Sequence, residues 1–261
     1  RYSFRAGTAR KQMRKLGLIG GTSWHSTVEY YATINRLIND RHGDNTNPSL
    51  RIISLNQKQI HDLQRSDDWD AIAELFARAA LELQGVGVDA IALCANTPHK
   101  VFDQLRTSVS IPILHIADAI GATLEKGGLD TAGLIGTRFT MAQDFIKGRL
   151  ARRYQVKTIV PTVSEQREIQ DLIYNELSVG VFDDGTRDFF LRVIDSLSAR
   201  GARAIILGCT EIPLLLSDAH CPIPPVDSLK CHCEAIAQYI LDDGSPEQSP
   251  AGDVLKAAPE E

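Results

Sequence analysis

An internal repeat is the feature of this chain that most constrains its fold. Three short segments of the first half return in the second half, in the same order and with similar letters. They are LGLIG (16–20) and AGLIG (132–136), IALCANT (91–97) and IILGCTE (205–211), and IPI (111–113) and CPI (221–223). The offsets of 116, 114 and 110 residues shrink gradually, as in two copies that have diverged through small changes of loop length. Two similar units of this kind predict a ligand cleft between them.

Length and composition agree with two domains in one chain. With 261 residues, the chain exceeds the usual size of a single core, so two domains of roughly 100–130 residues are expected. Apolar residues make up 43%, yet no apolar run approaches the ~18 residues needed to span a bilayer. A net charge of −5 gives no overall attraction for nucleic acid. The five irregularly spaced cysteines fit a reducing cytosol better than a disulfide framework.

The two ends of the chain differ from its middle in composition. Residues 1–15 include six basic side chains and no acidic one, and Met13 lies just before the first strand, so residues 1–13 are interpreted as a leader or disordered tail. Residues 243–261 are rich in Pro, Gly, Ser and acids and are predicted to be disordered. Between the ends we expect a first domain (14–117), a second domain (118–227) and a C-terminal helix (228–242) that packs back on the first domain.

Short β-branched runs alternate with longer amphipathic runs along the chain. Strands are predicted at 15–20, 50–55, 88–94, 111–116, 131–136, 156–160, 203–208 and 223–226. Helices are predicted at 26–41, 68–85, 98–106, 117–126, 140–153, 164–178, 186–200 and 229–241. Strands that are apolar throughout and alternate with helices indicate an α/β fold, with one parallel sheet flanked by helices in each of two pseudo-symmetric domains. The active site of such a fold lies beyond the carboxyl ends of the strands, here in the cleft between the domains.

Glycine- and hydroxyl-rich turns close the first strand of each copy. They are GGTSW (20–24) and GTRFT (136–140). Glycine lets the backbone approach a ligand, and the N-terminus of the following helix offers free N–H groups to a carboxylate or phosphate. Neither turn has the spacing of a dinucleotide-binding or P-loop motif. An ordinary turn with Thr22 or Ser23 as helix cap is the alternative, and the occurrence of two equivalent turns favours an anion site.

The segments CANTPH (94–99) and GCTEIP (208–213) contain the reactive groups. Each follows a buried strand, and each proline suits the first turn of a helix. A thiol at such a helix N-terminus is expected to have a lowered pKa. Cys209 could instead be a small buried hydrophobic residue, but the polar residues that follow it argue for a catalytic role. In the register of the repeat Cys209 faces Ala95, and strand alternation then turns Cys94 toward the core.

Five motifs together make the chain recognisable. They are GGTSWHST (20–27), CANTPHK (94–100), HIADA (115–119), GTRFTM (136–141) and GCTEI (208–212). On these motifs the chain, from about residue 15 to 239, resembles the cofactor-independent aspartate/glutamate racemase family, most closely its bacterial branch of broad-specificity amino-acid racemases. The resemblance implies two pseudo-symmetric α/β domains, usually a homodimer, and an isomerase that uses neither pyridoxal phosphate nor a metal. One thiolate removes the α-proton, and an opposed thiol from the other domain returns one to the other face.

The resemblance implies one catalytic thiol, Cys209, and leaves the opposed position to Ala95. The family has its first-domain cysteine immediately before Asn-Thr, and a close branch specific for L-aspartate and L-glutamate has threonine there. Alanine neither donates nor accepts a proton, so we expect reduced or one-sided activity. The substrate-contacting positions of the family match Thr22, Gln64, Asn96, Thr97 and Thr210, although the family commonly has methionine in place of Thr22.

Three functions stay open on this basis. The first is an amino-acid racemase that acts on aspartate, glutamate or a related small substrate in the cytoplasm, with neither nucleic acid nor membrane as partner. The second is a single-cysteine decarboxylase of the arylmalonate type, in which the thiol protonates an enediolate after carbon dioxide leaves. The third is an amino-acid-binding protein that has lost catalysis.

Other candidate residues have weaker signals. The scattered histidines lack metal-ligand spacing, so no metal site is expected. The Cys231-His232-Cys233 run resembles a ligand cluster, but residues at i and i+2 diverge on a helix, which favours a surface or packing role. A dicarboxylic substrate would need a cationic partner, and four arginines are open candidates for it: Arg51, Arg65, Arg138 and Arg167.

Overall fold

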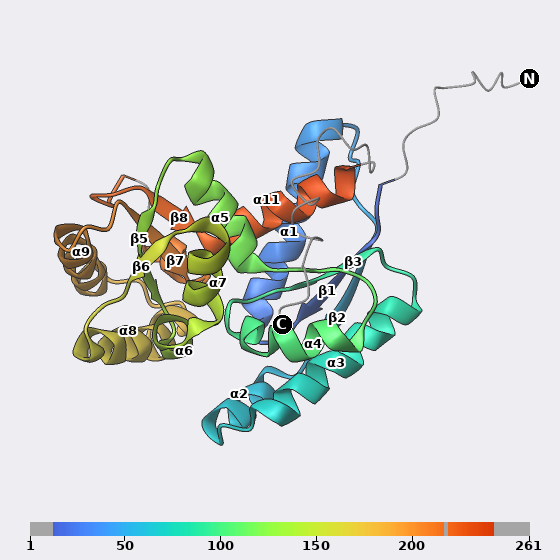
Figure 1. Ribbon diagram of the computed structural model, residues 1–261, viewed down its shortest axis with the longest axis horizontal. Helices are drawn as coiled ribbons and strands as arrows, with labels where there is room; N and C mark the ends of the chain where they lie inside the picture. The colour runs from blue at the N-terminus through green and yellow to red at the C-terminus, as the bar shows by residue number, and fades with distance from the viewer. Residues whose placement is uncertain (1–12, 217–218, 243–261) are drawn as a thin grey trace, which may run out of the picture.

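The computed structural model describes residues 13–216 and 219–242. Residues 1–12 of the leader predicted at 1–13, and the whole tail predicted at 243–261, lie outside the described residues. The described part folds into two α/β halves that lie side by side (Figure 1). No described helix is both long enough and apolar enough to cross a membrane.

Each half is built on a sheet of four parallel strands. The first sheet has the order β2-β1-β3-β4, and the second has the equivalent order β6-β5-β7-β8. The strands are β1 (Leu16–Gly20), β2 (Leu50–Ser54), β3 (Ala90–Leu93), β4 (Ile113–Leu114), β5 (Thr131–Gly136), β6 (Lys157–Ile159), β7 (Ala204–Gly208) and β8 (Pro225–Asp227). The matching strand orders confirm the repeated α/β architecture that was predicted from the sequence.

Helices cover both faces of the two sheets (Figure 1). The α-helices are α1 (Trp24–His42), α2 (Gln57–Arg65), α3 (Trp69–Gly85), α4 (Phe102–Ser108), α5 (Ile116–Lys126), α6 (Arg138–Ala142), α7 (Asp144–Tyr154), α8 (Val163–Asn175), α9 (Asp184–Ala199), α10 (Ile212–Leu215) and α11 (Ser228–Leu241). Two 3₁₀ helices, η1 (Thr97–Val101) and η2 (Leu177–Val179), complete the described elements. Because both faces are covered, the central strands β1, β3 and β7 are buried along their whole length.

Three local predictions were wrong. The helix predicted at 98–106 is the 3₁₀ helix η1 followed by α4. The helix predicted at 140–153 is divided into α6 and α7, because Gln143 has extended backbone angles (φ −99°, ψ 166°) that interrupt the helix. The prediction also lacked α2, in which only Ile60 and Leu63 are apolar, so that its apolar periodicity is short.

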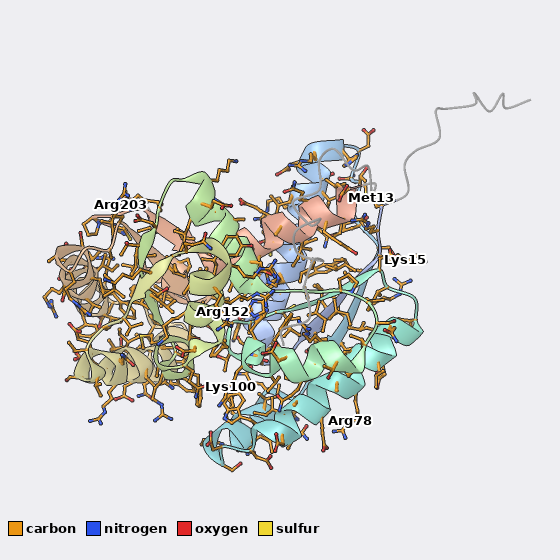
Figure 2. All side chains as sticks on the ribbon, in the orientation of Figure 1. Met13, Lys15, Arg78, Lys100, Arg152 and Arg203 are labelled. Carbon is orange, nitrogen blue, oxygen red and sulfur yellow. The ribbon has the colours of Figure 1, made fainter. Side chains whose placement is uncertain are left out.

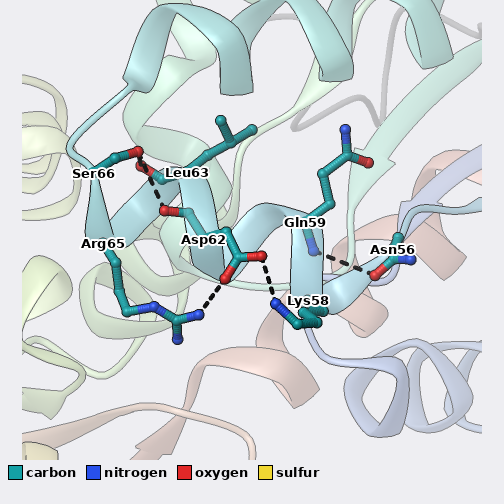
Figure 3. Close-up of polar contacts among 7 residues, drawn as sticks. All are labelled: Asn56, Lys58, Gln59, Asp62, Leu63, Arg65 and Ser66. Carbon is teal, nitrogen blue, oxygen red and sulfur yellow. Dashed lines mark hydrogen bonds and ion pairs between the residues drawn. The ribbon is translucent and has the colours of Figure 1, made fainter.

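Helix α2 is capped and flanked by polar contacts (Figure 3), and its Ile60 side chain is buried in the core of the first half. The Asn56 side chain caps it by accepting a hydrogen bond from the Gln59 backbone N–H at 3.3 Å. Asp62 forms ion pairs with Lys58, at 2.7 Å, and with Arg65. This capped helix brings Gln64 to the edge of the first half that faces the second.

Helix α11 joins the cores of the two halves. Cys233, Ile236 and Ile240 pack with β1 and α1, whereas Cys231 packs with α5 and β5. A second contact between the halves lies at Lys100, labelled in Figure 2. Its ammonium group lies 3.5 Å from the ring centroid of Trp69 and 5.8 Å from that of Phe139 in the other half. The domain limits at 117/118 and 227/228 stay predictions.

Candidate functional site

A cavity of about 380 Å³ lies between the halves, at the carboxyl ends of the central strands. The structure brings all six predicted site residues to its wall: Thr22, Gln64, Asn96, Thr97, Cys209 and Thr210. They come from the turn after β1, from α2, from the segment after β3 and from the segment after β7. Their roles stay predictions. The five that follow strands converge because the carboxyl ends of parallel strands meet at one edge of each sheet, whereas Gln64 comes from α2.

Cys209 is part of a hydrogen-bonded network that spans the cavity wall. Its thiol donates to Glu211 Oε2 at 2.9 Å, and the Thr210 hydroxyl donates to the same oxygen at 2.9 Å. Ser26 of α1 lies 2.7 Å from the Thr210 hydroxyl oxygen. Because the Thr210 proton is directed to Glu211, Ser26 is the donor in that pair. The network therefore ties the reactive cysteine to the opposite half.

The expected lowering of the Cys209 pKa is wrong. Burial of the sulfur, followed by the charge and hydrogen bond of Glu211, raises the pKa of this thiol well above its usual value. The backbone N–H groups of Thr210 and Glu211 act in the opposite direction but are weaker. The helix that follows, α10, has four residues and begins only at Ile212, so its dipole offers little compensation. Cys209 is a protonated thiol with a carboxylate in contact.

Cys94 and Ala95 face opposite sides of the first sheet's end. Cys94 is 2% exposed and packs in the core with Leu16 and Leu114, as strand alternation predicted. Burial also raises the pKa of its thiol. Ala95 is partly exposed and lines the same cavity as Cys209. The first half therefore presents a methyl group where the resemblance implied a second acid–base group.

The turn after β1 has both the capping and the ligand-facing features proposed for it. The Ser23 hydroxyl caps α1 by accepting from the Ser26 N–H at 3.4 Å, which leaves Thr22 free to line the cavity. Gly21 has φ +89°, and a Cβ there would lie 2.0 Å from the Leu55 carbonyl oxygen. Only glycine fits this close approach, so the turn depends on it. In the second half, Thr137 also lines the cavity and lies 3.4 Å from the Thr97 hydroxyl.

Several titratable residues of the cavity wall were missed as site candidates. The His61 ring lies 5.9 Å from the Tyr174 ring of the second half, and burial lowers the pKa of the imidazole. Burial raises the pKa of the Tyr174 phenol. Glu211 was also missed as a partner of Cys209, although the GCTE motif has it two residues away. For His61 the only signal was helical spacing from Gln64, which became useful once α2 was known.

The four candidate arginines do not line the main cavity within the described part of the chain. Arg65 and Arg138 line a neighbouring hollow that shares Gln64 with it. Arg65 is also paired with Asp62, and Arg51 donates to Ser49 Oγ and to the Leu50 carbonyl. None of the four is therefore positioned to hold a substrate carboxylate in the main cavity.

The Cys231-His232-Cys233 run is buried and has a packing role. His232 Nε2 lies 3.1 Å from the Leu114 carbonyl, so it carries the proton, and Nδ1 accepts from the Tyr30 hydroxyl at 2.9 Å. Burial lowers the pKa of His232 to about 3. Across the described residues, no group of three or more His, Cys, Asp or Glu side chains is arranged to hold a metal ion.

Comparisons with known proteins bear on the family and the fold of the chain. Residues 19–236 match the family model described as Asp/Glu/Hydantoin racemase. A putative Asp/Glu racemase from Yersinia pestis, known as a crystal structure, is 38% identical, with a TM-score of 0.84 over 88% of this chain and 100% of that one. The broad specificity amino-acid racemase RacX of Bacillus subtilis is 23% identical over 68% of this chain and 76% of its own.

A glutamate racemase of Histophilus somni is 25% identical over 59% of this chain. The match spans 56% of that relative, so just over half of its length has a counterpart here.

Proposed function

Because the chain belongs to the Asp/Glu/Hydantoin racemase family, we propose that it is a pyridoxal-phosphate-independent amino-acid racemase. Its substrate is aspartate, glutamate or a related amino acid. One observation supports this most directly: in a cavity of amino-acid size, the Cys209 thiol donates to the Glu211 carboxylate at 2.9 Å. A thiol that contacts a proton acceptor at the carboxyl end of a buried strand is suited to proton transfer at carbon.

In the proposed reaction Glu211 accepts the thiol proton, and the resulting Cys209 thiolate removes the α-proton of the substrate. The carbon retains the electron pair, which is delocalised into the substrate carboxylate. A water molecule reprotonates the carbon from the opposite face and gives the other enantiomer. The sulfur keeps the proton that it took from the substrate, and Glu211 gives its proton to the hydroxide that the water leaves. The hydroxyl groups of Thr22 and Thr97, which line the cavity, are suited to hold the carboxylate.

Ala95 makes the proposed reaction slow or one-sided. A group on the face opposite Cys209 must supply the second proton, and the methyl group of Ala95 cannot. Loss of one acid–base group typically costs ~10²–10⁴-fold in rate. Proton exchange at the enantiomer whose α-hydrogen faces Cys209 does not need the second group, so exchange should outlast inversion.

The proposed setting is the cytoplasm, and the proposed assembly is a homodimer. An apolar stripe supports a second protein surface on α1: Trp24, Val28 and Tyr31 are each about half exposed and lie four and three residues apart on one helical face. Analytical ultracentrifugation of the parent and of Val28→Lys tests this. We expect the parent to be a dimer and the variant to dissociate. A monomeric parent, or a variant that remains a dimer like the parent, would contradict the proposed interface.

A single-thiol decarboxylase of the arylmalonate type is the second candidate, since one observation favours it. Among the described cavity residues, only Cys209 offers a thiol. Protonation of an enediolate after carbon dioxide has left needs one proton donor and no opposed base. Under this alternative, the raised pKa of Cys209 would keep the donor protonated at neutral pH.

A panel of amino acids and arylmalonates separates these functions. Chiral chromatography measures inversion, mass spectrometry in D₂O measures α-proton exchange, and carbon dioxide release measures decarboxylation. We expect exchange and slow inversion of aspartate or glutamate, both abolished in Cys209→Ala and retained in Cys94→Ala. Carbon dioxide release from a malonate without amino-acid exchange would establish the second candidate, and binding without turnover would leave a binding protein.

A further inference from the structure

Ser228 occupies a fully buried position between the two halves, outside the cavity wall. It is the first residue of α11 and directly follows β8. The Asp227 side chain caps this helix by accepting from the Leu229 N–H at 2.9 Å and the Lys230 N–H at 3.2 Å. The strand before Ser228 and the cap around it hold its side chain in one place.

The Ser228 hydroxyl contacts both site segments at once. It donates to the Leu207 carbonyl of β7 at 2.8 Å, two residues before Cys209. It also lies 3.0 Å from Asn96 Nδ2, in the segment after β3 that presents Ala95 and Thr97 to the cavity. One hydroxyl group therefore connects the strand end of one half to the site segment of the other.

The directions of these two hydrogen bonds are fixed by chemistry. A carbonyl oxygen can only accept, so the single Ser228 proton is directed to Leu207. The Ser228 oxygen must then accept from Asn96, which requires the NH₂ end of the amide to face Ser228. The other end, Asn96 Oδ1, is buried and has no hydrogen-bond partner among the described residues. Ser228 thus fixes the orientation of the side-chain amide of Asn96, a residue of the cavity wall.

We propose that Ser228 is a positioning residue that sets the relative placement of the two site segments and the orientation of the Asn96 amide. Two other hydroxyl contacts across the halves, Ser26 with Thr210 and Thr97 with Thr137, are only partly buried, so water can replace them. Ser228 is fully buried, and its removal leaves the Asn96 NH₂ group without this partner in a place closed to solvent. The effect on turnover rests on the proposed racemase function, whereas the effect on the segments themselves does not.

The test compares Ser228→Ala with Ser228→Thr, which keeps the hydroxyl, and with Ser108→Ala. Ser108 is a matched control, because its hydroxyl donates to the Leu105 carbonyl at 2.7 Å within one half. Mass spectrometry measures the rate of backbone-amide hydrogen exchange in the peptides that contain residues 94–97 and 207–210. We expect Ser228→Ala to speed exchange about tenfold in both peptides together, and Ser108→Ala in neither.

A second measurement uses the rate at which iodoacetamide alkylates Cys209 in the native protein. Loosening of the β7 end should raise this rate at least about threefold in Ser228→Ala, with the parent rate restored in Ser228→Thr. Asn96→Ala combined with Ser228→Ala should give less than the product of the two single effects, because both remove one shared bond.

The proposal is overturned if only one peptide responds, or if Ser228→Ala matches Ser108→Ala in both measurements. Multiplicative effects in the double variant would overturn the shared-bond argument even if Ser228→Thr is too crowded to fold. A parent protein that racemises nothing would contradict the proposed function and leave these measurements able to decide the role of Ser228. With an active parent, Ser228→Ala should raise KM for aspartate more than it lowers kcat.

Discussion

Glu211 is expected to lower the thiolate fraction of Cys209 and also to assist proton transfer by this thiol. Glu211→Gln should therefore raise the rate of Cys209 alkylation and lower the rate of α-proton exchange. The Cys209 sulfur and Glu211 Oε2 are 2.9 Å apart. At that separation two unit negative charges repel each other by ~1.4 kcal/mol even at the dielectric constant of water, and by more in a partly buried site. The neutral amide removes this repulsion, so the pKa of the thiol falls and the thiolate fraction at pH 7 rises at least about tenfold.

The assay pairs the rate of Cys209 alkylation by iodoacetamide with the rate of α-proton exchange of aspartate in D₂O. Alkylation should rise about tenfold or more, whereas exchange should fall by ~10²–10⁴-fold because the amide cannot pass the abstracted proton from the sulfur to solvent. Glu168→Gln is the matched control, since Glu168 is exposed on α8 and outside the cavity wall. A fall of both rates in Glu211→Gln, or an alkylation rate equal to that of the control, would refute the reasoning.

Three further outcomes are expected. Ala95→Cys should speed inversion by ~10²–10⁴-fold in chiral chromatography, and an already fast parent that Cys94→Ala inactivates would show that the register is wrong. Burial lowers the pKa of His99 to about 4 and of His232 to about 3, so the unfolded chain binds protons more readily. Urea unfolding should accordingly find full stability above about pH 6.5 and progressive loss toward pH 4, and a pH-independent midpoint over that range would contradict it. Asp118→Ala should cost ~3–5 kcal/mol in the same assay, because it leaves the Arg149 guanidinium without the carboxylate that it contacts at 2.7 Å through two bonds. A cost below ~1 kcal/mol would show that this pair is solvated.

Much of the fold could be predicted because it depends on local sequence patterns that occur twice in the chain. The repeated strand and turn segments gave two parallel sheets of equivalent order, and they placed the Cys209 segment and the Asn96 segment at strand ends. Strand alternation was enough to turn Cys94 into the core and Ala95 toward the cavity. These conclusions need only the side-chain period of a strand and the direction of parallel strands.

The local prediction failed where an element has little apolar surface or a single residue interrupts it. Helix α2 escaped detection because Ile60 and Leu63 are the only apolar residues in its nine positions, too few to give a helical period. Without α2, the approach of His61 to the Tyr174 ring could not be foreseen. The extended backbone angles of Gln143 divide α6 from α7, and the apolar periodicity of the sequence does not reveal such a break.

The sequence by itself determined that the Cys209 and Asn96 segments lie at strand ends, and only the tertiary structure added His61 to the cavity wall and decided the pKa of the thiol. Spacing placed Cys209 before a short helix and suggested a lowered pKa, but burial and the Glu211 carboxylate raise it. Ser228 meets Asn96, 132 residues away, and Leu207, 21 residues away, because α11 enters between the halves. Solvation and long-range partners depend on which surfaces the fold brings together, and a one-dimensional pattern holds no record of those distances.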